Sequence, residues 1–139
     1  MAGLALLIRL SRQVAEERQI SLGQVTQAHA EAVAATVEHE MGVAAECQIA
    51  ANDLDALAAL GRWASEAARR GKVLQRRRSD LAHSEVAARG ALHDAFIDLK
   101  RLELVLDTAL ETAAYTSRRR ADLLADEREQ IRRAGADAA

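Results

Sequence analysis

Apolar residues recur every seven positions through the second half of the chain, and this pattern predicts its main structural element. The first row comprises Leu74, Leu81, Ala88, Ala95, Leu102, Ala109, Thr116 and Leu123. The second row comprises Leu92, Leu99, Leu106 and Ala113. This spacing is typical of a coiled-coil seam, because a repeat of about 3.5 residues keeps one stripe facing a partner helix. Proline is absent, so we expect one long helix that needs a companion.

A thinner apolar row predicts another long helix in the first half of the chain. Its members are Leu4, Ile8, Ala15, Leu22, Val25, Ala32, Thr36, Val43, Cys47, Ala50, Leu54 and Leu57. A competing face is formed by Ala30, Val33, Val37 and Met41. The pattern therefore predicts a helix here but leaves its register open.

Composition favours a thin interface between two helices over a globular core. Half of the residues are apolar, yet the chain has one Trp, one Tyr and one Phe. Alanine and leucine suit a narrow seam, whereas a thick interior needs larger side chains. We predict an all-α fold, in which two long helices form an antiparallel coiled-coil hairpin and the second helix overhangs. Residues 1–139 are expected to form a single domain.

The turn of this hairpin is expected between residues 52 and 61. Asn52 and Asp53 favour a helix end, and Gly61 is a candidate for the reversal because glycine adopts a left-handed C-cap easily. The predicted first helix covers about residues 3–57 and the second about residues 62–133.

The charge pattern supports an antiparallel arrangement. Residues 31–55 contain six acidic residues and no Lys or Arg, whereas residues 62–78 contain seven basic residues and one acid. Folding back near residue 58 lays these blocks side by side and opposes a parallel alignment. Two unrelated solvated faces are the alternative interpretation.

The helix lengths predict that the first helix covers the second only as far as about Thr112. Residues 113–134 are then expected to project alone, with Leu123, Leu124 and Ile131 set among arginines. Apolar side chains that the chain cannot cover indicate a docking surface for another molecule.

Features of enzymes and metal proteins are missing from the sequence. The four histidines form no H-x-x-x-H pair, none follows a Glu by three residues, and Cys47 is the single cysteine. No glycine-rich phosphate loop is present. We therefore expect no catalysis, no cofactor and no metal.

The formal net charge of −2 argues against binding to nucleic acid, and the arginine triplets lack interleaved aromatic residues. The sequence has no apolar run of about 18 residues and no basic segment ahead of its apolar start. A cytoplasmic protein that is not inserted in a membrane is expected.

The pattern resembles the flagellar FliJ family of export-apparatus proteins. The resemblance rests on Arg62 and Trp63 at the start of the second helix, the segment at residues 96–103, and Asp126 and Glu127 within the charged end. The segment reads Phe96, Ile97, Asp98, Leu99, Lys100, Arg101, Leu102 and Glu103.

The resemblance implies a coiled-coil stalk at the cytoplasmic side of the inner-membrane export apparatus. Its implied partners are the flagellar export ATPase hexamer, the cytoplasmic part of the export gate and export chaperones. The residues implied for ATPase binding are Arg9, Arg12, Arg118, Arg119, Arg120, Leu123, Leu124 and Asp126. Those implied for gate binding are His39, Val43, Glu46, Arg69, Val73, Arg76 and Asp80. A self-associating structural coiled coil without an ATPase partner is the alternative.

Overall fold

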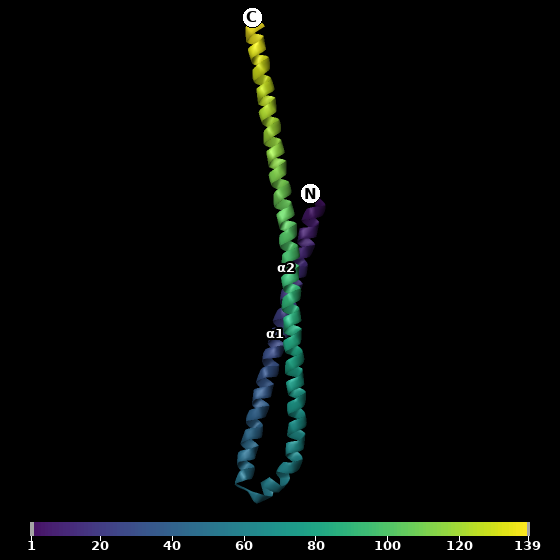
Figure 1. The fold of residues 1–139 in the computed structure, drawn as a ribbon, viewed down its shortest axis with the longest axis vertical. Coiled ribbons are helices and arrows are strands. Elements are labelled where there is room, and N and C mark those ends of the chain that lie inside the picture. Colours follow the sequence, from purple (N-terminus) through teal and green to yellow (C-terminus); the bar gives the residue numbers. More distant parts are fainter. Residues whose placement is uncertain (1, 139) are drawn as a thin grey trace. The chain divides into compact units, whose positions relative to one another are not determined.

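The protein folds as an all-α helical hairpin of two helices, α1 (Ala2–Ala51) and α2 (Leu54–Ala138). A computed structural model describes residues 2–138, and Figure 1 traces the two helices along the sequence. These residues divide into two compact units. One unit contains residues 2–12 and 97–138, and the other contains Gln13–Phe96 with the turn. The prediction of an all-α hairpin is confirmed.

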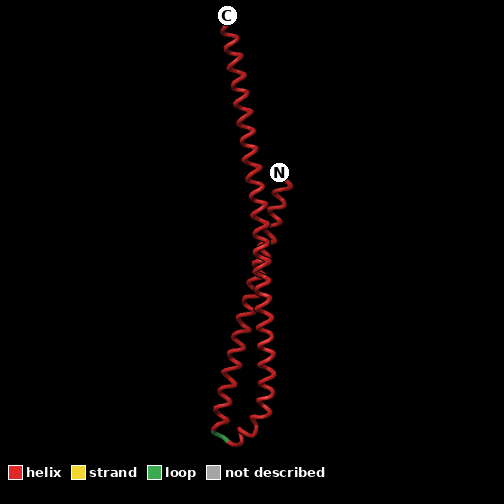
Figure 2. Tube along the Cα trace, viewed as in Figure 1, coloured by secondary structure: helices red, strands yellow, loops and turns green. Residues whose placement is uncertain are grey.

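The turn consists of Asn52 and Asp53, where Figure 2 shows a short loop between the two helices. The side chain of Asn52 donates a hydrogen bond to the carbonyl oxygen of Gln48 at the end of α1. Asp53 is the N-cap of α2, because its Oδ1 atom accepts a hydrogen bond of 3.0 Å from the backbone N–H of Asp55. The reversal thus uses local side-chain caps and no left-handed residue.

The turn lies at the first edge of the predicted window, and α2 begins at Leu54 rather than near residue 62. The candidate reversal at Gly61 is wrong, because Gly61 lies inside α2 and no described glycine has a positive φ. Helical spacing of the apolar residues between the turn and Gly61 continues without a break, and the N-cap at Asp53 is sufficient to start the helix there.

The seam follows the predicted rows of α2 from Leu74 to Ala109. Ala95 and Leu99 are buried, and the other members of this stretch are half-buried. On α1 the buried positions are Ile8, Ala15, Ala32, Thr36 and Ala50. Cys47, Leu54 and Leu57 are exposed, as are Ala30, Val37 and Met41 of the competing face. The row that begins at Leu4 is therefore the one that faces α2, and the competing face is not.

Two polar contacts cross the seam within the unit Gln13–Phe96. His29 Nδ1 lies 2.8 Å from Glu85 Oε2, and the Glu85 side chain is only 12% exposed. The second contact joins His39 to Ala67. The hairpin lays the acidic and basic blocks together in this unit, but no ion pair of the described residues joins them. Their complementarity therefore acts over longer distances, where screening weakens it.

Candidate interaction surfaces

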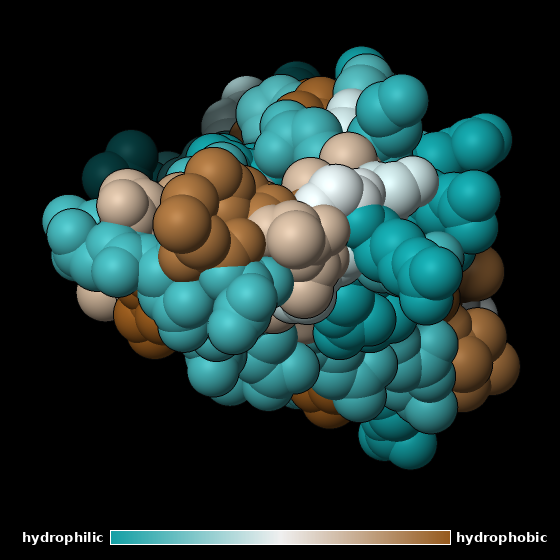
Figure 3. All heavy atoms as spheres, turned by 90° about the horizontal axis from the view of Figure 1, so that it is seen from below, coloured by the Kyte–Doolittle hydropathy of each residue, from teal (hydrophilic) through white to brown (hydrophobic). Residues whose placement is uncertain are grey.

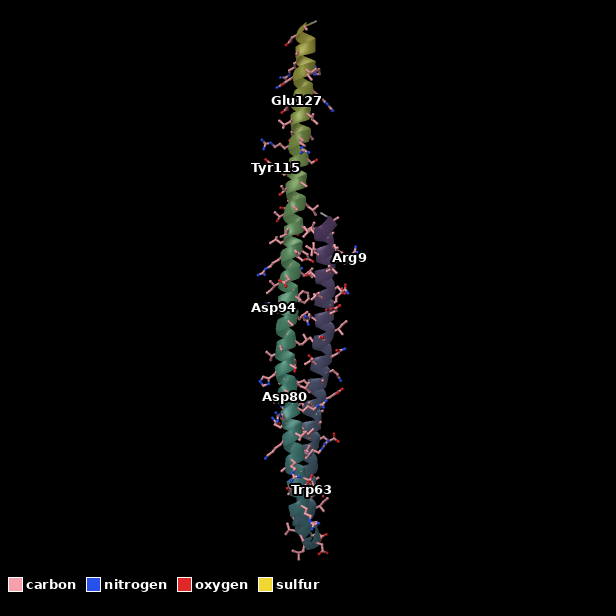
Figure 4. All side chains as sticks on the ribbon, turned by 90° about the vertical axis from the view of Figure 1, so that its right-hand side faces the viewer. Arg9, Trp63, Asp80, Asp94, Tyr115 and Glu127 are labelled. Atoms are coloured by element: carbon pink, nitrogen blue, oxygen red, sulfur yellow. The ribbon has the colours of Figure 1, made fainter. Side chains whose placement is uncertain are left out.

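An apolar groove of about 380 Å³ opens between α1 and α2 close to the turn. Trp63 is half-buried in its wall, and Cys47 lies exposed at its edge. Figure 4 places Trp63 near the turn end of α2. The groove is lined by His39, Glu40, Val43, Cys47, Leu60, Trp63, Ala64, Ala67, Ala68 and Gly71. Small residues on α2 leave this space because they cannot span the gap between the helices.

His39 closes one side of this groove. Its Nε2 atom lies 2.9 Å from the carbonyl oxygen of Ala67, so the ring N–H donates a hydrogen bond to the other helix. A Cβ atom built on Gly71 would lie 3.3 Å from the same nitrogen, and the glycine thus lets the imidazole approach the backbone of α2. A second groove of about 450 Å³ shares His39, Val43, Trp63 and Ala67 and adds Glu46, Glu66 and Arg70.

The surface near the turn also exposes large apolar side chains. Leu54 is 83% exposed, and Ile49 and Leu57 are exposed as well. Figure 3, which views the chain from this end, shows apolar side chains in patches between hydrophilic ones. Hydrophilic side chains separate these patches in this view.

The structure gathers part of the predicted gate-binding set. His39, Val43 and Glu46 all line the second groove. Arg69, Val73, Arg76 and Asp80 are exposed and line neither groove. Arg69 instead forms an ion pair of 3.3 Å with Glu66 on its own helix.

Sequence reasoning missed the contribution of Trp63 and Gly71 to this site. The heptad row that contains Glu85 and Leu92 reaches Gly71 when it is extended backwards. That extension was a usable signal for Gly71. Trp63 was noted only for its place at the start of the second helix, although a lone tryptophan near a seam is itself a signal for a half-buried anchor.

The second surface is the C-terminal segment, defined here as residues 110–138 of α2. Every residue from 110 to 128 is exposed, although the segment is helical throughout. Its large apolar side chains are 49–71% exposed and comprise Leu110, Tyr115, Leu123, Leu124 and Ile131. Figure 4 shows Tyr115 and Glu127 on this bare part of the helix.

The predicted ATPase-binding residues fall into two groups. Arg118, Arg119, Arg120, Leu123, Leu124 and Asp126 are all exposed on the C-terminal segment. Arg9 and Arg12 are exposed on α1, and Arg12 Nη2 lies 3.5 Å from Glu103 Oε1. Arg118 follows Glu103 by 15 residues, which corresponds to roughly 22 Å along α2. The structure therefore does not bring the two groups together.

Two carboxylates in the same unit are held in their charged form by neighbouring bases. The pKa of Glu103 is lowered, first by a hydrogen bond from Lys100 and also by Arg12. The pKa of Glu129 is lowered by hydrogen bonds from Arg132 and Arg133, and that of Arg132 is raised by the same contact. These are ion pairs of an exposed helix surface.

Within residues 2–138, no group of three or more His, Cys, Asp and Glu side chains is arranged to hold a metal ion. None of the described helices combines the length and apolarity required for a bilayer span. No family model, curated protein or solved structure matches this chain.

Proposed function

We propose that this protein is a non-catalytic coiled-coil adaptor of a flagellar type III protein export apparatus. The observation that carries the proposal is the bare C-terminal segment, which exposes Leu123 and Leu124 by 55% and 53%. A helix that is not packed against another gains little stability in water, since most helical stability in proteins comes from burial of an apolar face. A partner protein that covers this stripe supplies that burial.

In this proposal the partner is the export ATPase hexamer, as the resemblance to the FliJ family implies. Leu123 and Leu124 supply the apolar contact, while Arg118, Arg119 and Arg120 steer the approach of an acidic surface. Arg9 and Arg12 lie on α1 of the same unit and contact the ATPase separately from the arginine triplet. The protein works in the cytoplasm at the inner-membrane export apparatus and needs no cofactor.

The grooves near the turn are the proposed contact for the export gate and the export chaperones. The first groove offers mainly apolar walls with His39 at one edge, which suits a large apolar side chain from a partner helix. The proposed gate contact is therefore centred on His39, Val43, Glu46 and Trp63 rather than on the outer face that carries Val73 and Asp80.

The second candidate function is a structural coiled coil that associates with itself and has no ATPase partner. The favouring observation is a set of exposed apolar residues on the unit that contains the N-terminal part of α1. This set comprises Leu6, Leu7, Leu10, Leu104 and Val105. Packing of a second hairpin against this unit covers them without any ATPase.

Binding of the full chain to a purified export ATPase hexamer tests the proposal. We expect Arg118→Glu, Arg119→Glu and Arg120→Glu together to weaken binding, most strongly at low salt, because screening is weakest there. Truncation of Leu123 and Leu124 to Ala is expected to weaken binding at every salt concentration, since each substitution removes apolar burial of about 0.8 kcal/mol per CH₂. Helicity should remain unchanged in both variants. Unchanged affinity in both would favour the structural alternative.

A further inference from the structure

The outer face of α2 carries a row of basic side chains near the turn. Arg62, Arg69 and Arg76 follow one another in steps of seven, and successive members of such a row differ by only about 20° around a helix. Lys72 and Arg77 flank the row, about 60° and 80° to either side of Arg69. All five residues are exposed. We call this set the basic face.

The basic face points away from α1. The seam residues of this part of α2, Ala67, Gly71 and Leu74, are half-buried. They lie about 140–200° around the helix from Arg69. His39 of α1 bonds the backbone of α2 at Ala67, on this seam side. Since α1 packs on the opposite side of α2, it leaves the basic face uncovered.

Acidic side chains neutralise little of this charge. Glu66 lies 3.3 Å from Arg69 and forms an ion pair with it. Among the ion pairs of residues 2–138, none includes any other member of the basic face. The formal net charge of −2 for the whole chain therefore conceals a local excess of positive charge on one side of α2.

The basic face has little of what a folded protein partner would need. Its five members line none of the grooves described near the turn. Val73, which is 64% exposed, is the large apolar side chain that lies among them. Protein interfaces depend on a few aromatic or apolar anchors that fill pockets. A surface that offers separate positive charges instead suits a flat array of negative charges.

We propose that the basic face binds the surface of an anionic lipid bilayer, with residues 62–77 of α2 lying along the phosphate-bearing headgroups. Clusters of about four to eight Lys and Arg on one helix are typical of segments that bind acidic lipids. Headgroups diffuse laterally and gather beneath fixed positive charges, so this match requires no pocket. The contact extends over roughly 22 Å of helix.

The acidic block of α1 does not cancel this attraction. When the basic face meets the bilayer, α1 lies behind α2 at an interaxial distance of about 8–10 Å. The Debye length is about 8 Å at physiological ionic strength. Carboxylates on α1, such as those of Glu31 and Glu38, are therefore screened from the headgroups that the basic face contacts. Their repulsion instead turns the hairpin so that α2 faces the bilayer.

A nucleic acid duplex is the competing polyanion. Nucleic-acid-binding domains are usually strongly basic as a whole, whereas this chain has a formal net charge of −2 and a basic surface on one side of one helix. A bilayer is flat and meets only that side. The inference does not rest on the proposed export function, since the binding needs only the purified chain and lipid.

Vesicle co-sedimentation of the full chain tests the inference. The vesicles contain phosphatidylcholine, either alone or with about 30% phosphatidylglycerol, a lipid content at which surface charge attracts basic segments. We expect binding to the anionic vesicles only, with a loss as the salt concentration rises. Arg62→Gln, Arg69→Gln and Arg76→Gln together should weaken it by at least about tenfold, because each basic side chain near such a surface contributes about a fivefold factor.

The matched control removes the same charge elsewhere on α2. Arg101→Gln, Arg128→Gln and Arg133→Gln together lower the net charge equally, and all three residues are exposed. This variant should keep most of the binding. Replacing Arg62, Arg69 and Arg76 by Lys should also keep it, since the attraction depends on charge and not on the guanidinium group. Circular dichroism should show equal helicity, because Gln and Lys are good helix formers.

Three results would overturn the proposal. The first is no binding to anionic vesicles at about 50 mM salt, where screening is weak. The second is an equal loss in both Gln variants, which would show that net charge and not the basic face controls binding. The third is binding to a DNA duplex that exceeds binding to vesicles at equal phosphate concentration and is lost in the Arg62, Arg69 and Arg76 variant. That result would assign the face to nucleic acid.

The orientation of the bound hairpin is measured with an environment-sensitive fluorophore. Cys47→Ala removes the native thiol, and a single cysteine replaces Val73 on the basic face or Met41 on α1. Both positions are exposed in the free chain, at 64% and 68%. Addition of anionic vesicles should shift the emission of the label at position 73 and leave that at position 41 unchanged. A shift confined to position 41 would contradict the inference.

Discussion

His39 on α1 donates a hydrogen bond from its Nε2 atom to the carbonyl oxygen of Ala67 on α2, across 2.9 Å. This hydrogen bond and the His29 to Glu85 contact both cross the seam of the unit Gln13–Phe96. His39 also borders both grooves near the turn. One imidazole therefore links the two helices beside these grooves.

The first prediction concerns this tie. His39→Ala should lower the free energy of unfolding by about 1–2 kcal/mol, because it removes an interhelix hydrogen bond and enlarges the groove. The matched control is His83→Ala, since His83 is exposed and bonds only Ser79 on its own helix. Urea unfolding followed by circular dichroism compares the two. Equal stability of both variants would show that His39 contributes nothing to the hairpin.

The second prediction tests the seam of α2. Leu99 is 6% exposed, whereas Leu104 on the same helix is 66% exposed. Leu99→Asp should destabilise the hairpin by several kcal/mol, because it buries a charge without a partner. Leu102→Asp should also destabilise it, to a lesser degree, since Leu102 is half-buried. Leu104→Asp should change the melting temperature little. A wild-type melting temperature for Leu99→Asp would contradict the seam.

The heptad rows were sufficient to predict the fold and most of the seam, because a 3.5-residue repeat constrains which residues face a partner helix. The rows did not predict the polar members of the seam, His29 and Glu85. Both occupy seam positions, but a pattern of apolar residues does not include them. The turn falls inside the predicted window, at Asn52 and Asp53, and only the start of the second helix near residue 62 was placed too late. A glycine does not force a reversal, whereas a cap requires its helix to begin.

The candidate site was less predictable than the fold. Exposure of Arg118, Arg119, Arg120, Leu123 and Leu124 follows from helix lengths alone, and the structure has these residues exposed. The grooves depend on the separation of two helices near Trp63, which no periodicity encodes. A set such as Arg69, Val73 and Asp80 follows one outer face of a helix, and only coordinates show that this face borders no groove.

The third prediction concerns Thr36, the buried polar residue of the α1 seam. Its hydroxyl donates a hydrogen bond of 2.9 Å to the carbonyl oxygen of Ala32, which is also within reach of the backbone N–H of Thr36. Thr36→Val keeps the shape and removes the buried hydroxyl, so we expect unchanged stability or a gain of up to about 1 kcal/mol. Thr108→Val, at an exposed position with the same bond, is the control. A clear loss of stability confined to Thr36→Val would show that its hydroxyl has a further partner.

The last prediction concerns the pH response of Glu103. Its pKa lies below the ordinary value for glutamate, chiefly because Lys100 donates a hydrogen bond to it, with Arg12 as a further contributor. A group with a lowered pKa in the folded state stabilises that state above its unfolded pKa, and the contribution is lost as pH falls through the folded value. The contact between Arg12 and Glu103 should therefore weaken on acidification below about pH 4.3, the ordinary pKa of glutamate.

Carboxyl titration of Glu103 by nuclear magnetic resonance measures this effect. Lys100→Ala should raise the pKa of Glu103 toward its ordinary value, and Arg12→Ala should raise it by a smaller amount, because Lys100 makes the larger contribution. Arg101→Ala is the matched control, since Arg101 is adjacent in sequence but lies 3.8 Å from Asp98 instead. A Glu103 pKa that responds more to Arg101→Ala than to Lys100→Ala would contradict the assigned contacts.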